Sequence, residues 1–148
     1  MTARRIRLLI ADDHLMFRRA LRALLDLDPS FEVVGEAADG KRLLALIGDT
    51  PADVVLMDMA MPGLTGVEVL ERLDEATRSR VIVLTAQASP SDLADATRLG
   101  AACVLLKDVD LEALHGAIRR LATGNRPRPC PIACAEAADP ARGEARGL

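Results

Sequence analysis

Aromatic side chains are nearly absent from this chain, which has no Trp, no Tyr and only two Phe among its 148 residues. The core must therefore be built from aliphatic side chains, and a surface that stacks nucleobases on aromatic rings is not expected. Cysteine is also scarce, with three residues at positions 103, 130 and 134 that form no regular framework. This odd number at irregular spacing argues against a disulfide-stapled secreted domain, so we expect reduced thiols.

Long apolar runs and an excess of positive charge are missing as well. Runs such as Val54–Met57 and Val81–Leu84 fall far short of the roughly 20 residues that cross a bilayer. The apolar stretch near the N-terminus stops at Ala11 against two aspartates, too early for a secretory signal. The chain has 19 Lys and Arg against 22 Asp and Glu, a net charge of −3, so neither nucleic acid nor an anionic membrane is the default partner. We expect a cytoplasmic protein.

The composition changes near residue 124. Residues 124–148 hold four of the eight prolines, are rich in Ala, Gly and Arg, and lose the apolar periodicity of the preceding chain. We therefore expect one folded domain over residues 5–123, followed by a disordered tail over residues 124–148.

Within the domain, short apolar runs alternate with segments of helical period, which is typical of a parallel sheet with helical crossovers. The runs are nearly continuous, as in strands covered on both faces. The predicted strands are Ile6–Ala11, Phe31–Ala37, Val54–Met57, Val81–Thr85 and Cys103–Leu106.

Five helices are expected between and after these strands. Apolar spacing predicts a first helix around Phe17–Leu25 whose Arg18, Arg19 and Arg22 lie on a solvated side. The others are predicted from Gly40 to Ile47, from Gly66 to about Glu75, from Pro90 to Leu99 and from Leu111 to Gly124. Ser89 and Gly100 are the expected cap residues of the fourth helix.

Polar residues follow the predicted strands in a consistent way: Asp12 and Asp13, Asp58, Thr85 and Lys107. Ligand sites in open parallel sheets lie at the carboxyl ends of the strands. Two carboxylates about 4 Å apart repel by about 4 kcal/mol at an effective dielectric constant of roughly 20. Either a carboxyl pKa rises or a divalent cation binds, and we favour Mg²⁺, which takes one or two carboxylates plus waters. A carboxylate can also attack phosphorus, and such a transfer needs a metal, a lysine and a hydroxyl around the phosphoryl oxygens.

The segments IADDH, LMDMAMPGLTG, VLTA and GAACVLLKD together resemble the receiver domain of bacterial two-component response regulators. LLKD with the DDH start is most similar to the subfamily that usually carries a LuxR-type helix-turn-helix output domain. The resemblance implies a flavodoxin-like five-stranded parallel sheet of order 2-1-3-4-5, with helices on both faces.

The same resemblance implies roles for individual residues. Asp58 would be the phosphoacceptor, and Asp12, Asp13, Asp58 and the backbone carbonyl of Ala60 would hold Mg²⁺. Thr85 and Lys107 would contact the phosphoryl group, which a sensor histidine kinase or a histidine phosphotransfer protein would supply. Such a domain is a phosphoacceptor with at most slow self-dephosphorylation, not an enzyme.

Two features depart from the family pattern. Val104 stands where the family has a switch aromatic, so we expect any output change to run through the loop after Thr85 and the helix Pro90–Leu99. The tail shows no helix-turn-helix pattern, which would need roughly 60 more residues, so no direct DNA binding is expected from this chain. The face formed by residues 90–123 is a candidate homodimer contact.

Three alternatives stay open. The rivals of a phosphorylated receiver are a phosphorylation-independent binding module, a fragment of a DNA-binding transcriptional regulator, and a Mg²⁺-dependent phosphatase of the haloacid-dehalogenase type. The last would require a second aspartate where Ala60 stands.

Overall fold

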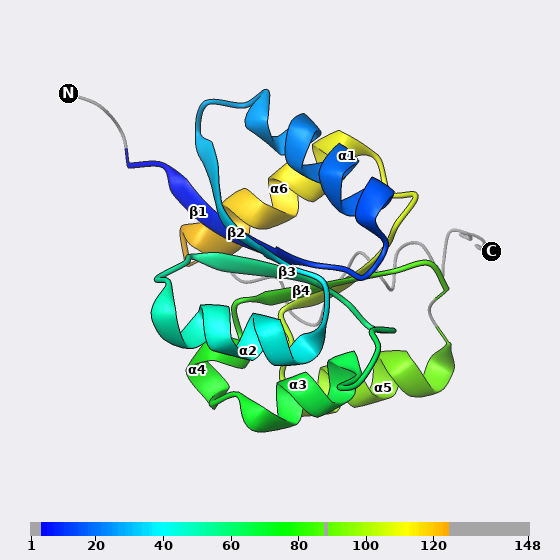
Figure 1. The fold of residues 1–148 in the computed structure, drawn as a ribbon. Helices are drawn as coiled ribbons and strands as arrows, with labels where there is room; N and C mark the ends of the chain where they lie inside the picture. Colours follow the sequence, from blue (N-terminus) through cyan, green and yellow to red (C-terminus); the bar gives the residue numbers. More distant parts are fainter. Residues whose placement is uncertain (1–3, 88, 125–148) are drawn as a thin grey trace.

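A five-stranded parallel sheet forms the centre of the molecule in the computed structural model, which describes residues 4–87 and 89–124 (Figure 1). The strand order is β2-β1-β3-β4-β5, which confirms the order expected from the resemblance. The strands are β1 (Ile6–Ala11), β2 (Phe31–Ala37), β3 (Val54–Asp58), β4 (Val81–Thr85) and β5 (Cys103–Leu106). Only β3 differs from the predicted bounds, because Asp58 still pairs with Leu84 of β4.

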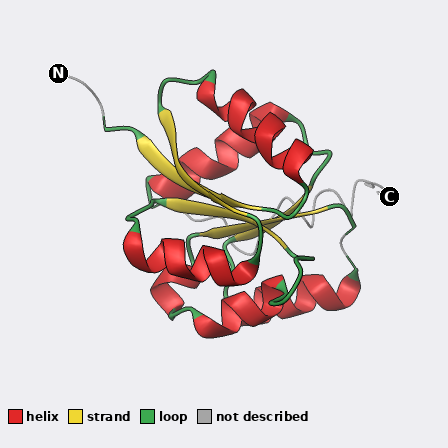
Figure 2. Cartoon of the chain, viewed as in Figure 1, coloured by secondary structure: helices red, strands yellow, loops and turns green. Residues whose placement is uncertain are grey.

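Helices cover both faces of this sheet (Figure 2). They are α1 (Leu15–Asp26), α2 (Gly40–Asp49), α3 (Gly66–Arg72), α4 (Glu75–Arg78), α5 (Pro90–Leu99) and α6 (Leu111–Ala122). Helices α1 and α6 pack on one face, while α2, α3 and α5 pack on the other. Among residues 4–87 and 89–124, Phe31 is the only fully buried aromatic ring, and the rest of the core is built from aliphatic side chains, Met and Cys103, as the composition predicts. None of the helices within the described residues has the length and apolarity needed to span a membrane.

The third predicted helix is wrong at its end, because α3 stops at Arg72 and a separate short helix, α4, begins at Glu75. Leu73 leaves the helical conformation (φ −95°, ψ 153°), and the Asp74 side chain accepts a hydrogen bond from the Thr77 amide to start α4. Side-chain capping by Asp satisfies an amide that would otherwise lack a partner at a helix start. The predicted caps of α5 are confirmed, with Ser89 accepting from the Asp92 amide and Gly100 in the left-handed region at φ 92°.

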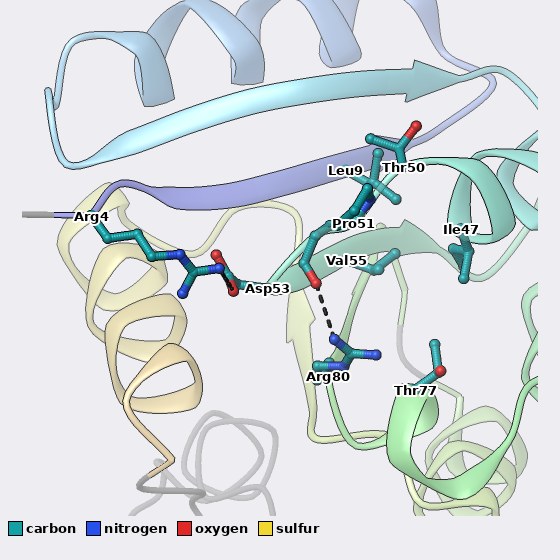
Figure 3. A pocket seen from close by; sticks show the side chains of 10 residues that line it. Arg4, Leu9, Ile47, Thr50, Pro51, Asp53, Val55, Thr77 and Arg80 are labelled. Carbon is teal, nitrogen blue, oxygen red and sulfur yellow. Dashed lines mark hydrogen bonds and ion pairs between the residues drawn. The ribbon is translucent and has the colours of Figure 1, made fainter.

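At the amino ends of the strands, a hollow of about 360 Å³ lies between β3, the end of α2 and α4 (Figure 3). Arg4 pairs with Asp53 at 2.8 Å, and Arg80 donates to the Ala52 carbonyl at 3.1 Å, so both guanidinium groups are engaged by protein oxygens. The polar site residues predicted from sequence lie at the opposite edge, where β1, β3, β4 and β5 end, whereas Val104 lies within β5.

Candidate functional site

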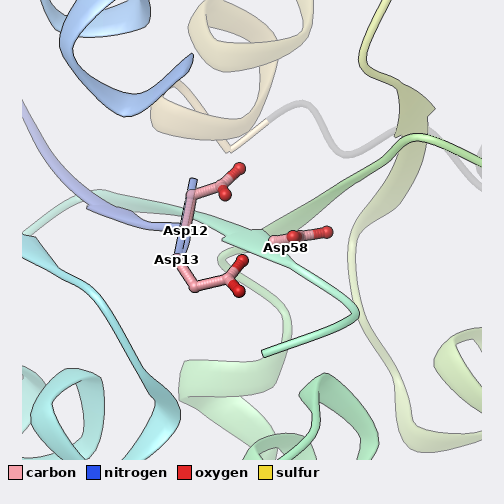
Figure 4. A group of neighbouring side chains, drawn as sticks. All are labelled: Asp12, Asp13 and Asp58. Atoms are coloured by element: carbon pink, nitrogen blue, oxygen red, sulfur yellow. The ribbon is translucent and has the colours of Figure 1, made fainter. Parts of the chain in front are cut away.

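Three carboxylates meet at the carboxyl ends of β1 and β3 (Figure 4). Asp12 and Asp13 directly follow β1, and Asp58 is the last residue of β3. One oxygen from each lies within 4.8 Å of the others. Asp12 and Asp58 are buried, with 2% and 6% of their surface exposed, whereas Asp13 is exposed. The cluster therefore has two buried members and one that faces solvent.

Both the backbone and the carboxylate of Asp12 are bound by neighbouring groups. Its amide donates to the Ala37 carbonyl at 3.0 Å, which continues the pairing between β1 and β2. Its Oδ1 accepts from the His14 amide at 2.8 Å, and its Oδ2 lies 2.7 Å from Lys107 Nζ. His14 itself is the exposed N-cap residue of α1 and points no side-chain hydrogen bond at the helix.

Lys107 follows β5 and joins the two buried carboxylates. Its ammonium lies 2.7 Å from Asp12 Oδ2 and 3.3 Å from Asp58 Oδ2, and 4.6 Å from the centre of the Phe17 ring. Burial lowers the pKa of Lys107, but the hydrogen bond to Asp12 and the charges of both carboxylates outweigh burial and raise it on balance. Lys107 is therefore a permanent cation within the cluster.

The surroundings of Asp58 disfavour the charged form of its carboxyl group. Burial raises its pKa, and the neighbouring Asp12 charge raises it further, while Lys107 and the Ala60 amide act in the opposite direction. The Ala60 amide is 3.4 Å from Asp58 Oδ1. One lysine thus does not balance the carboxylates, and a further cation at this place would lower the free energy of the charged site.

The loop after β3 is shaped by two glycines. Gly63 has φ 77°, a conformation that favours glycine. The Gly66 amide donates to the Met59 carbonyl at 2.7 Å, and a Cβ on Gly66 would lie 2.9 Å from Met59 Cα. This close approach brings the start of α3 against the residue after Asp58 and keeps Ala60 beside the site.

Thr85 ends β4 on the far side of Asp58. It is buried, and its hydroxyl donates to the Gln87 carbonyl at 3.0 Å. Asp58, Ala60, Thr85 and Lys107 together line an open cavity of about 560 Å³. Val104, the predicted replacement for the family aromatic, is buried in β5 opposite Val83 of β4 and is not among the lining residues.

The donor set fits a small hard cation. Mg²⁺ takes oxygen ligands and keeps several waters, and the cluster offers carboxylate oxygens next to an open cavity. The same cavity brings a buried carboxylate, an ammonium and a hydroxyl together, the groups that a phosphoryl transfer requires. The cluster also lacks the second aspartate of a dehalogenase-type phosphatase, since Ala60 occupies that position.

One residue beside the site differs from its sequence interpretation. Arg18 was predicted on a solvated face of the first helix, but its side chain is only 14% exposed and is bound to Glu36 of β2 and to the Asp12 carbonyl. The helical periodicity alone does not reveal this contact, because Glu36 is 18 residues away in the sequence. The one sequence signal is the acidic residue near the end of an otherwise largely apolar strand.

Comparison with known proteins agrees with this geometry. The family model for the response regulator receiver domain matches residues 8–119. The nitrate/nitrite response regulator NarP of Escherichia coli is 40% identical over 119 residues, which are 80% of this chain and 55% of NarP. The chain therefore spans about half the length of the curated relatives it matches.

Solved structures show the same likeness. The receiver domain of NarL from Mycobacterium tuberculosis superposes with a TM-score of 0.74 at 36% identity, covering 82% of this chain and 99% of that domain. The isolated receiver domain of RcsB from Salmonella enterica, solved in the presence of the phosphomimetic BeF₃⁻, gives 0.73 at 27% identity and covers 84% and 94% of the two chains. The chain belongs to the response regulator receiver domain family of two-component systems.

Proposed function

We propose that this receiver accepts a phosphoryl group on Asp58 in a Mg²⁺-dependent reaction. The donor is a phosphohistidine on a sensor histidine kinase or a histidine phosphotransfer protein, and the product changes a protein-interaction surface. The observation that carries the proposal is the buried Asp58 carboxylate, which lies beside Asp12 and Lys107 and opens on a cavity that Thr85 also lines. A receiver of this kind is a cytoplasmic phosphoacceptor, and we place its boundaries at residues 5 and 123.

In the transfer, an oxygen of Asp58 attacks phosphorus while the phosphorus–nitrogen bond to the donor histidine breaks. The electron pair of that bond stays on the imidazole nitrogen. The product is a mixed anhydride on Asp58. Asp12, Asp13, Asp58 and the Ala60 carbonyl would hold Mg²⁺, which when bound would supply positive charge for the phosphoryl oxygens. Lys107 already lies 3.3 Å from Asp58 and neutralises a further oxygen. Thr85 donates its hydroxyl to the phosphoryl group after releasing the Gln87 carbonyl.

This release carries the signal outward. The Thr85 hydroxyl binds the backbone two residues further on in the loop that leads to α5. A phosphoryl group that attracts this hydroxyl removes the contact and frees the loop, without a ring on β5. We expect amide chemical shifts in α5 to change on phosphorylation. Unchanged shifts there would count against this route.

The test is intact mass after incubation with Mg²⁺ and a small acyl phosphate. We expect one added phosphoryl group in the wild type, and none in Asp58→Asn or when Mg²⁺ is omitted. Lys107→Ala should retain metal binding but lose most of the phosphorylation response. Labelling of the folded Asp58→Asn variant would refute Asp58 as the acceptor.

A second function has one specific observation in its favour. Val104 leaves β5 without the family's switch aromatic, so the chain is alternatively a binding module that works without phosphorylation. Normal partner binding by Asp58→Ala would favour this module, and loss of binding would favour the phosphorylated receiver.

A further inference from the structure

The Arg18 side chain contacts the backbone of Asp12, beside the proposed magnesium site. Arg18 lies in the first turn of α1, where its amide donates to the His14 carbonyl at 3.0 Å. Its guanidinium bridges two elements, with Nη1 donating to the Asp12 carbonyl at 2.6 Å and Nε donating to Glu36 Oε1 at 2.9 Å. Such a charge-assisted pair of contacts is stronger and more directional than a neutral hydrogen bond.

The Asp12 carbonyl belongs to the peptide plane that joins Asp12 to Asp13. Because this unit is planar, a hydrogen bond that holds the carbonyl also holds the Asp13 amide and Cα. The Asp13 carboxylate makes no hydrogen bond or ion pair with any residue between 4 and 124 that the structure describes. Its direction therefore depends on its backbone, unlike that of Asp12, which is bound to His14 and Lys107.

We propose that Arg18 is a positioning residue for the magnesium site, holding the Asp12–Asp13 peptide so that the Asp13 carboxylate faces Asp12 and Asp58. The inference rests on the proposed function, because it concerns the same Mg²⁺ site. Arg18 itself touches neither the cation nor the phosphoryl group. Replacing a residue that orients a metal ligand without touching the metal typically weakens metal affinity 10- to 100-fold.

Arg22 provides a matched control. Its guanidinium binds the other oxygen of Glu36, but it makes no contact with Asp12 and its side chain is 44% exposed. Arg18→Met and Arg22→Met each remove one positive charge from the same carboxylate while keeping an unbranched apolar stem. Only Arg18→Met also removes the hydrogen bond to the Asp12 carbonyl.

The sign of the effect separates positioning from simple charge. Removing a nearby positive charge alone would tighten cation binding, whereas loss of positioning weakens it. Because the chain has no Trp or Tyr, the Mg²⁺ dissociation constant is best measured by calorimetry. We expect it to rise about tenfold in Arg18→Met and to stay close to the wild-type value in Arg22→Met. Phosphorylation by an acyl phosphate should slow in Arg18→Met at low Mg²⁺ and recover at saturating Mg²⁺.

A metal-free measurement keeps the two proposals apart. Amide hydrogen exchange at Asp13 and His14 should be faster in Arg18→Met than in Arg22→Met. Wild-type affinity or tighter binding in folded Arg18→Met would overturn the positioning role, as would unchanged exchange. A wild type that binds no Mg²⁺ would refute the proposed function, and the exchange rates would still decide the role of Arg18. If Arg18→Met does not fold, Arg18→Lys serves instead, and we expect its Mg²⁺ dissociation constant to lie above the wild-type value, because one ammonium replaces a guanidinium that donates to two partners. A wild-type dissociation constant in Arg18→Lys would overturn the positioning role.

Discussion

Asp58 shows how a single residue can work against the stability of the fold that holds it. Its carboxylate is buried next to Asp12, and burial together with that charge raises its pKa above the ordinary value. A carboxyl group whose pKa is raised on folding destabilises the native state while it is ionised. Asn has nearly the same shape without the charge.

We therefore expect Asp58→Asn to be more stable than the wild type by about 1 kcal/mol in urea unfolding at pH 7 without Mg²⁺. The gain should shrink as the pH falls through the raised pKa of Asp58, because the wild-type carboxyl then becomes neutral as well. Asp53→Ala is the opposite control, since Asp53 accepts from the Arg7 amide and from Arg4 at 2.8 Å each, and it should lose stability. A loss of stability in Asp58→Asn would contradict this account.

Glu36 shows the reverse pH behaviour. Burial raises its pKa, but hydrogen bonds from Arg22 and Arg18 outweigh burial and bring the pKa below its ordinary value of 4.5. A lowered carboxyl pKa stabilises the fold fully above the unfolded value, and this stabilisation is lost as the pH falls through the folded value. Glu36→Gln should therefore cost about 1 kcal/mol at pH 7, and the difference from wild type should disappear in acid. A difference that is equal at pH 7 and pH 3 would show that the charge is not the cause.

At the scale of elements, the site depends on how closely α3 approaches the end of β3. The capping box of Thr65 and Glu68 fixes where α3 begins, and the Gly66 amide binds the Met59 carbonyl. Any side chain at position 66 must move this helix start away from the residue that follows Asp58.

Gly66→Ala tests that dependence. Its Cβ would lie 2.8 Å from Met59 Sδ and 2.9 Å from Met59 Cα, and overpacking of this kind costs about 1 to 3 kcal/mol. Gly48→Ala, in α2, has nothing within 4 Å of its Cβ and should gain about 0.5 to 1 kcal/mol from helix propensity. Chemical denaturation of both variants checks the contrast. Equal effects would mean that backbone propensity, not the contact with Met59, sets the outcome at position 66.

For the whole molecule, a cation that binds the acidic cluster as proposed would couple binding to folding. An ion that binds only the folded chain raises the free energy of unfolding with the logarithm of its concentration. At about 100 times the dissociation constant, this amounts to roughly 2.7 kcal/mol. Both faces of the sheet pack on β1, which Asp12 follows, and on β3, which Asp58 ends. The gain should therefore appear in the global unfolding transition.

Thermal unfolding with increasing Mg²⁺ measures this coupling. We expect the melting temperature of the wild type to rise with Mg²⁺ and that of Asp13→Ala to rise much less, since the proposed site then lacks one of its carboxylates. An equal rise in the two proteins would place the ion elsewhere on the surface.

The sequence by itself determined the strands, the starts of most helices and the five polar residues at the strand ends, because apolar periodicity and capping act within a few residues of chain. The resemblance to receivers added the strand order and the residue roles. Those roles stay predictions until the phosphorylation and metal experiments test them. Only the tertiary structure decided the break between α3 and α4, the Thr85 contact with Gln87 and the bridge from Arg18 to Asp12 and Glu36. The bridge joins residues that are neighbours only after β1 and β2 pair and α1 packs beside them, and no local pattern encodes that proximity.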